Sequence, residues 1–180
     1  MEDGSFCPEP LPGGRWGKVP LVCVLMKGPV LEDVRVGKIT VDGMDATEVL
    51  LNLLKDMRFG VVMLGGISFA GFNLIDPWAV YDRYGTPVIV VARKRPDNKS
   101  VKRALMRHFD DWAERWEVIR RLGKIHSVET FPGEPPIHFE VVGATEEWAA
   151  EVLKDYAMIC RVPEPVRVAR IVARGVSQLP

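Results

Sequence analysis

Residues 19–27 read Val-Pro-Leu-Val-Cys-Val-Leu-Met-Lys, an almost continuous apolar run that ends before Gly28. Such a run is typical of a buried strand. Residues 34–41 (Val-Arg-Val-Gly-Lys-Ile-Thr-Val) alternate apolar and polar side chains, as a half-buried strand does. We therefore expect the fold to open with two neighbouring strands, one fully buried and one with a solvent-facing side.

The chain then alternates between helix and strand patterns. Asp45-Ala-Thr-Glu48 predicts a capping box at the start of a first helix, because an acid at the cap and a Glu three residues later satisfy backbone N–H groups. Asp76-Pro77 predicts the start of a second helix and Gly85 its end. Further strands are expected at residues 61–64, 87–91 and 137–142.

The second half is expected to be richer in helices. An apolar stripe from Val101 to Ile119 predicts one long helix over residues 99–122, and two more helices are expected at 145–158 and 165–176. Early strands followed by alternating strands and helices indicate an α/β domain with a mixed sheet covered by helices. We expect residues 1–180 to form a single domain.

Composition excludes several classes of protein. Hydrophobic residues make up 47% of the 180 residues, and 24 basic side chains balance 24 acidic ones, which excludes a disordered tail and a polycation that coats nucleic acid. No apolar run reaches the roughly 18 residues of a membrane span, and the start lacks a signal peptide, so we expect a soluble cytoplasmic protein.

Three cysteines without a close pair indicate neither a disulfide framework nor a zinc ribbon. Three Asn and one Gln against 14 Pro favour a protein from a hot environment.

Charge is uneven along the chain despite the neutral sum. Between residues 93 and 107 a single acid, Asp97, stands among seven basic residues: Arg93, Lys94, Arg95, Lys99, Lys102, Arg103 and Arg107. The last predicted helix carries Arg167, Arg170 and Arg174. Two interpretations remain open, a solvated helix surface and the footprint of a polyanion.

Two further patterns have a chemical and a structural interpretation each. Asp42, Asp45 and Glu48 cluster before the first helix, and Glu2-Asp3 precede Gly4. Carboxylates gathered from separate strands can hold a divalent metal, whereas a capping box and an Asp-Gly turn need no ligand. Likewise Gly65-Gly66 could cradle a phosphate or form an ordinary turn.

Four segments together resemble a known family. They are Val41-Asp-Gly-Met-Asp-Ala-Thr-Glu48, Met63-Leu-Gly-Gly-Ile-Ser-Phe-Ala-Gly-Phe-Asn73, Pro87-Val-Ile-Val-Val-Ala-Arg-Lys94 with Pro96, and Pro163-Glu-Pro-Val-Arg-Val-Ala169. In this order they are similar to the mainly archaeal endonuclease V-like proteins. The resemblance implies an RNase H-like fold, a mixed and mostly five-stranded β-sheet with helices on both sides. It also implies descent from a Mg²⁺-dependent nuclease that nicks nucleic acid near deaminated bases such as inosine.

The resemblance assigns roles to individual positions. The first acid of the metal site falls on Glu2 or Asp3, and the helix acid falls on Glu48. Gly65 stands where the family's nuclease has a third acid, and Arg170 where it has a histidine. A lysine that contacts the reacting phosphate corresponds to Arg93.

These replacements change the expected chemistry. Glycine offers no ligand and a guanidinium repels Mg²⁺ while it suits phosphate, so we expect weakened metal binding at this position. The chain also begins within the family's first strand, so either the natural start lies upstream or the site is open at that edge.

Three hypotheses for function follow from the sequence. The first is an endonuclease V-related protein that binds nucleic acid, with metal-dependent cleavage weak or lost; the expected contacts are Arg93, Lys94, Arg95, Arg167 and Arg170. The second is an active Mg²⁺ endonuclease with a shifted site; its candidate catalytic residues are Glu2, Asp3 and Glu48, and its candidate metal ligands are Asp3, Glu48, Asp42 and Asp45. The third is a small-molecule binder that holds phosphate or a nucleotide at Gly65-Gly66 and the arginine face.

Overall fold

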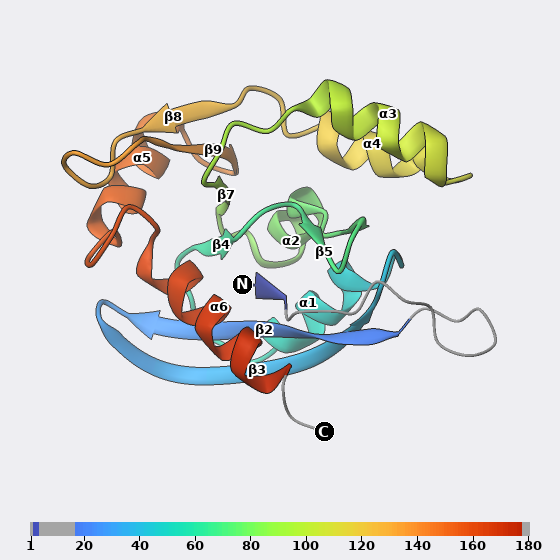
Figure 1. Ribbon diagram of the computed structural model, residues 1–180. Coiled ribbons are helices and arrows are strands. Elements are labelled where there is room, and N and C mark those ends of the chain that lie inside the picture. The colour runs from blue at the N-terminus through green and yellow to red at the C-terminus, as the bar shows by residue number, and fades with distance from the viewer. Residues whose placement is uncertain (1, 4–16, 178–180) are drawn as a thin grey trace.

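The strands of the protein form two separate sheets and a short ribbon (Figure 1). The structure is a computed structural model that describes residues 2–3 and 17–177. One sheet is antiparallel in the order β1-β2-β3; its strands are β1 (Glu2–Asp3), β2 (Lys18–Lys27) and β3 (Val30–Thr40). The other is mixed in the order β4-β7-β9-β8; its strands are β4 (Val62–Leu64), β7 (Val88–Ala92), β9 (Ile137–Val142) and β8 (His126–Val128). The ribbon pairs β5 (Ser68–Phe69) with β6 (Asn73–Leu74).

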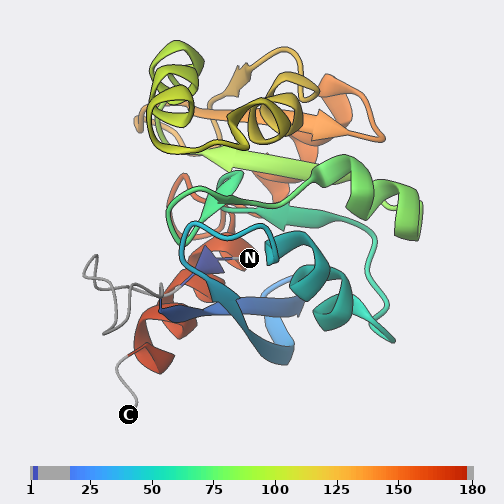
Figure 2. The same cartoon turned by 90° about the vertical axis from the view of Figure 1, so that its right-hand side faces the viewer.

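Helices cover both sheets. α1 (Ala46–Leu54) and α6 (Glu164–Val176) lie on opposite faces of the β1-β2-β3 sheet (Figures 1 and 2). α2 (Pro77–Tyr84) packs against β7, and α5 (Glu146–Asp155) packs against β9. α3 (Asn98–His108) and α4 (Trp112–Arg120) pack against each other at one end of the molecule. No helix in the described ranges is both long and apolar enough to cross a bilayer.

The strand that was predicted at residues 87–91 shows why its sequence is apolar throughout. Val88 and Val90 of β7 belong to one hydrophobic core cluster, with β2, β3 and α1. Ile89 and Val91 belong to a second cluster, with β9 and α5. Because successive side chains of a strand point to opposite faces, a strand between two cores needs apolar residues at every position.

The start and end of α2 confirm the sequence prediction. The Asp76 side chain accepts a hydrogen bond from the Trp78 backbone N–H at 2.9 Å, and Pro77 occupies the first turn. Gly85 ends the helix with φ of 63°, a left-handed conformation that glycine adopts without strain.

Two local predictions were wrong. The helix predicted over 99–122 is interrupted, because Phe109 is extended (φ −135°, ψ 129°) and the chain turns there between α3 and α4. The capping box at Asp45 does not form, because the Asp45 side chain makes no hydrogen bond to the start of α1. The apolar stripe continues across the turn, so periodicity alone did not reveal the interruption.

The sheet also differs from the single five-stranded sheet that the resemblance implied. Within the described residues, no ladder joins β1 to β4. A cavity of about 440 Å³ lies between residues 23–27 of β2 and residues 59–63 before and within β4. The two sheets are therefore linked through side-chain packing and through α6, which packs against β1, β2 and β4.

Candidate functional site

A basic cavity of about 750 Å³ lies where β4 and β7 end. The two strands are parallel, so their carboxyl ends meet at one edge of the sheet, and the turn Gly65-Gly66 and the segment 92–94 follow them directly. The loop 160–162 and the side chains of α6 at Val166, Arg167 and Arg170 complete the lining. In open α/β folds ligands bind at this edge, which makes the cavity the first candidate for the functional site.

Four of the five basic residues predicted to contact nucleic acid line this cavity. Arg93, Lys94, Arg167 and Arg170 contribute to its wall, and Arg95 lies beside it, exposed, without lining it. Arg93 and Lys94 are exposed, and neither side chain forms an ion pair with a described residue. No carboxylate is among the described lining residues, so the field in the cavity favours an anion over a cation.

The Pro-Glu-Pro-x-Arg segment fixes one of these cations. Glu164 is buried, and its carboxylate accepts two hydrogen bonds from Arg167, from Nε at 2.7 Å and from Nη2 at 2.6 Å. The hydrogen bonds from Arg167 lower the pKa of Glu164, and their effect is larger than that of burial, which raises it. A bidentate pair holds the guanidinium in one orientation and offsets part of its charge. Arg167 therefore contributes fixed geometry to the cavity more than it contributes net charge.

Arg161 is a cavity residue that the sequence interpretation missed. Its Nη1 donates to the carbonyl oxygens of Arg93 (3.2 Å), Pro135 (3.1 Å) and Pro136 (3.2 Å). The side chain therefore ties the segment after β7 to the loop before β9. Nothing in the spacing of Arg161 could have indicated this, because its partners lie 25 to 68 residues away along the chain.

The acids before α1 form a structural hydrogen-bond network with the Phe-Ala-Gly-Phe-Asn segment. Asp45 accepts bonds from the Thr40 backbone N–H at 3.1 Å and from the Thr40 hydroxyl at 2.8 Å. The Asn73 amide donates to Asp45 Oδ1 at 2.6 Å and to the Thr40 carbonyl at 2.8 Å, and its oxygen accepts the Ala46 N–H at 3.0 Å. Partial burial raises the pKa of Asp45, but the hydrogen bonds from Thr40 and Asn73 outweigh it and lower that pKa overall. Asn73 of β6, and not Asp45, thus caps α1.

Asp42 belongs to the same structural unit. Its Oδ1 accepts the Phe72 backbone N–H at 2.8 Å, and its carbonyl oxygen accepts a bond from Arg115 at 3.0 Å. Gly71 has φ of 83°, and a side chain there would collide with the Asp42 carboxylate. The Asp-Gly-x-Asp-Ala-Thr-Glu and Phe-Ala-Gly-Phe-Asn segments are therefore bonded to each other, with both aspartates engaged as hydrogen-bond acceptors.

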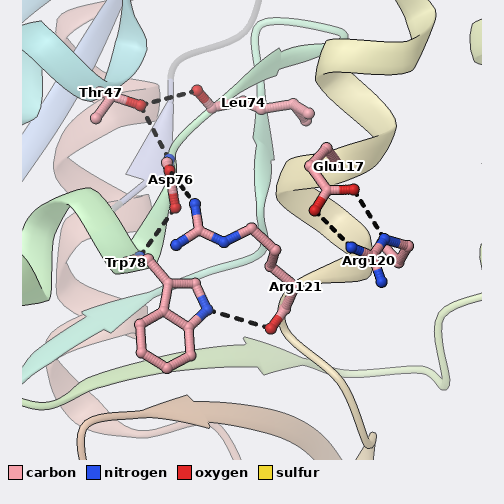
Figure 3. A network of polar contacts seen from close by, with 7 residues as sticks. All are labelled: Thr47, Leu74, Asp76, Trp78, Glu117, Arg120 and Arg121. Carbon is pink, nitrogen blue, oxygen red and sulfur yellow. Dashed lines mark hydrogen bonds and ion pairs between the residues drawn. The ribbon is translucent and has the colours of Figure 1, made fainter.

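A second set of polar contacts continues this unit toward α2 and α4 (Figure 3). The Thr47 hydroxyl donates to the Leu74 carbonyl at 3.3 Å and accepts the Asp76 N–H at 2.9 Å. The Trp78 indole N–H donates to the Arg121 carbonyl at 3.1 Å, and the Arg121 guanidinium lies 3.5 Å from the Asp76 carboxylate. These contacts hold α1, α2 and the end of α4 together, and none of them leads into the basic cavity.

The remaining candidate acids are Glu48, Glu2 and Asp3. Glu48 is exposed in the first turn of α1, and it does not line the basic cavity. Glu2 and Asp3 form β1 beside β2, and their side chains lie outside the described residues. Among the side chains that the structure describes, no three His, Cys, Asp or Glu are grouped as a metal site would require. The described residues around the cavity therefore do not fit a Mg²⁺ ion, and we derive no chemical step through one.

Comparison with known proteins places these observations in a family. The Endonuclease dU family matches residues 3–177. The chain belongs to the Endonuclease dU family. A UPF0215 protein of Pyrococcus furiosus is 39% identical over 184 residues, which cover 99% of this chain and 90% of that protein. A UPF0215 protein of Methanothermobacter thermautotrophicus is 39% identical over 158 residues, covering 86% of this chain and 76% of that protein. The relatives are archaeal and several are thermophilic, which fits the hot environment that the amide-poor composition favoured.

Two solved structures are similar in fold to this chain. A protein of unknown function from Archaeoglobus fulgidus has a TM-score of 0.83 at 29% identity, covering 98% of this chain and 95% of that one. Endonuclease V of Ciona intestinalis, solved with DNA containing an inosine followed by a ribo-adenosine, has a TM-score of 0.58 at 17% identity, covering 89% and 79%. The predicted endonuclease V-like family and the RNase H-like mixed α/β fold are confirmed.

Proposed function

We propose that the protein binds nucleic acid at the basic cavity, holding backbone phosphates with Arg93, Lys94, Arg167 and Arg170. The single observation that carries this proposal is that these cations line one cavity whose described lining residues include no carboxylate. Arginine and lysine side chains supply most phosphate contacts in protein–nucleic acid complexes, and a guanidinium held by a carboxylate is already oriented.

The comparisons suggest which nucleic acid to test first. The family description names deoxyuridine, and the endonuclease V structure of similar fold was solved with DNA that contains inosine. Both bases are products of deamination. We therefore infer that single-stranded DNA with one deoxyuridine is the first ligand to measure, beside matched strands with inosine or thymine.

Fluorescence anisotropy at low ionic strength tests the proposal. Lys94→Ala and Arg170→Ala should each weaken binding by roughly 3- to 30-fold, the usual range for one lost phosphate contact. Arg83→Ala is the matched control, because Arg83 is exposed at the end of α2, before β7 begins, and so lies at the opposite edge of the sheet. It should leave affinity unchanged. Absence of salt-dependent binding to any of the three strands would reject the proposal.

A binder of free phosphate or nucleotide would respond differently. If the cavity is a small-molecule pocket, a mononucleotide should raise the melting temperature of the protein, and the size of the rise should depend on which nucleotide is added. Binding to a strand should instead strengthen with oligonucleotide length. Thermal-shift measurements with mononucleotides and with oligonucleotides of increasing length separate the two functions.

Cleavage is a separate question, and we expect it to be weak or lost. Asp42 and Asp45 are engaged in the hydrogen-bond network before α1, and Gly65 offers no ligand at the edge of the cavity. Incubation of the three strands with Mg²⁺ or Mn²⁺ tests this expectation. Efficient metal-dependent nicking that disappears in Glu48→Gln would contradict it and would support the shifted metal site with Glu2, Asp3 and Glu48.

A further inference from the structure

The cavity of about 440 Å³ between β2 and β4 is a second site, which nucleic-acid binding at the basic cavity does not use. Residues 23–27 of β2 pair with β3 on one side. On the other side the described partner is β1, which pairs only with Leu21 and Val22. β4 pairs with β7, and its outer side has no partner among the described strands. Two open strand edges therefore border one cavity.

This cavity is covered on both faces of the sheet. α6 packs against β1, β2 and β4, and its Pro165 lines the cavity. Leu54, Met57 and Phe59 line it from α1 and from the segment that follows α1, which lies on the opposite face of β2. Backbone N–H and C=O groups that are covered in this way need hydrogen-bond partners. The cavity is therefore suited to an occupant that pairs with backbone along its sides.

The charges of the lining lie at the exposed rim. Lys27, Glu32 and Arg58 are the charged residues of the described lining, and all three are exposed. Cys23 and Met63, which line the cavity from the two strands, are each 6% accessible. A buried wall without charge favours apolar side chains over a phosphate or a carboxylate. The occupant is thus expected to be polar in its backbone and apolar in its side chains.

β1 leads directly into this cavity. Figures 1 and 2 show β1 between β2 and β4. It runs antiparallel to β2, with Glu2 opposite Val22 and Asp3 opposite Leu21. Opposite residues of an antiparallel pair have a constant sum of residue numbers, so the next five positions on the N-terminal side of Glu2 fall opposite residues 23–27. These are the β2 residues that line the cavity.

We propose that the cavity is the site of an extended strand that continues β1 on its N-terminal side, between β2 and β4. The strand pairs antiparallel with residues 23–27 and presents its other edge to β4. A strand inserted between two open edges forms backbone hydrogen bonds on both sides, as in donor-strand complementation. The two sheets then become one, in the order β3-β2-β1-β4-β7-β9-β8.

A chain extended before Met1 tests the proposal. Adding Val-Ile-Val-Ile to the full chain should raise its melting temperature by at least about 6 °C, because the added strand buries apolar side chains and pairs with both edges. Val-Pro-Val-Pro is the matched control: it is also apolar, but proline cannot donate to a ladder, so it should leave the melting temperature unchanged. Equal melting temperatures for the two extended chains overturn the proposal.

Hydrogen exchange followed by NMR shows where the added strand lies. In the chain with Val-Ile-Val-Ile, those amides of residues 23–27 that point away from β3, and those of β4 that point away from β7, should exchange at least about tenfold more slowly than in the parent chain. Residues 126–128 of β8, at the far edge of the other sheet, should keep their exchange rates. Unchanged exchange at residues 23–27 would place the added residues elsewhere and overturn the proposal.

Decanoate tests whether the cavity is instead a pocket for a lipid-like molecule. It has an apolar chain to fill the cavity and a carboxylate that Lys27 or Arg58 can pair with at the rim. If decanoate raises the melting temperature of the parent chain, it should not raise that of the chain with Val-Ile-Val-Ile, because the strand fills the same space. An equal response of both chains overturns the proposal.

Discussion

Arg115 is a buried cation that the protein uses for structure alone. Its side chain is 5% accessible, and all five guanidinium N–H groups have partners. Nε and Nη2 bind the Asp111 carboxylate, Nη1 binds the carbonyl oxygens of Gly43 and Phe72, and Nη2 also binds that of Asp42. One side chain of α4 thus fixes two of the four segments that carry the family resemblance.

Replacing Arg115 should therefore lower the stability of the folded protein. Arg115→Ala leaves three carbonyl groups without a donor and should lower the free energy of unfolding by about 3 kcal/mol. Arg115→Lys keeps the charge but cannot reach these partners, so it should recover little of the loss. Urea denaturation measures both. Arg120→Ala, on the exposed side of the same helix, is the control and should not shift the midpoint. Full stability of Arg115→Lys would show that charge, and not geometry, matters here.

Asn73 has a comparable role for a neighbouring element, since it caps α1 from β6. Asn73→Ala removes the acceptor for the Ala46 N–H and two donated bonds, and should cost about 2–3 kcal/mol of unfolding free energy. Asn52→Ala, at an exposed position of α1, should cost less than about 0.5 kcal/mol. Chemical denaturation with helix content followed by circular dichroism checks both values. Equal effects would show that the network before α1 does not stabilise the helix.

At the scale of elements, the sequence pattern predicted the bounds of a strand best where both faces of the strand are buried. The strand at 137–142 was predicted with its observed bounds. β7 was predicted within one residue, because a strand between two cores has a continuous apolar sequence. The turn at Phe109 was missed because apolar spacing continues from α3 into α4, and the contacts of Arg115 that favour the turn come from residues more than 40 positions away. Local patterns do not contain such information.

β9 carries an acid into the interior, and this makes stability depend on pH. Glu140 is 4% accessible, and burial raises its pKa to about 7. The folded protein therefore binds a proton that the unfolded chain has lost between pH 4.5 and 7, so stability falls as pH rises through that window. The carboxyls of Asp45, Asp111 and Glu164 have lowered pKa values, so their contribution is complete above pH 5.

Glu140→Gln isolates this effect. The parent chain should lose about 2 kcal/mol of unfolding free energy between pH 5 and pH 8, after allowance for residual solvation. The Gln variant should lack this component, so the difference between the two proteins grows with pH and levels off above pH 7. Urea denaturation at several pH values measures the difference. Parallel stability curves for the two proteins would show that Glu140 is not protonated in the folded state near neutrality.

At the scale of the whole molecule, the candidate site combines predicted and unpredicted residues for a clear reason. Arg93, Lys94, Arg167 and Arg170 were proposed from family resemblance and charge, and the fold brings them to one cavity although α6 and β7 are far apart in the sequence. Asp42 and Asp45 were considered for metal binding on residue type, but type does not show which acids are already hydrogen-bonded. Arg161 and Arg115 act through backbone carbonyls, for which no residue type is a signal.

The zero net charge of the protein leads to a last prediction, which concerns how the affinity for nucleic acid depends on salt. With 24 basic and 24 acidic residues, the protein has no long-range attraction for a polyanion, so any affinity must come from the local cations of the cavity. Up to four phosphate contacts on a single strand give a slope of about −2 to −3 for log K against log salt. Lys94→Ala should make that slope shallower by about 0.7, while Lys99→Ala on exposed α3 and Arg83→Ala should leave it unchanged. A much steeper slope, or one that Lys99→Ala alters and Lys94→Ala does not, would place the nucleic acid on α3 and not at the cavity.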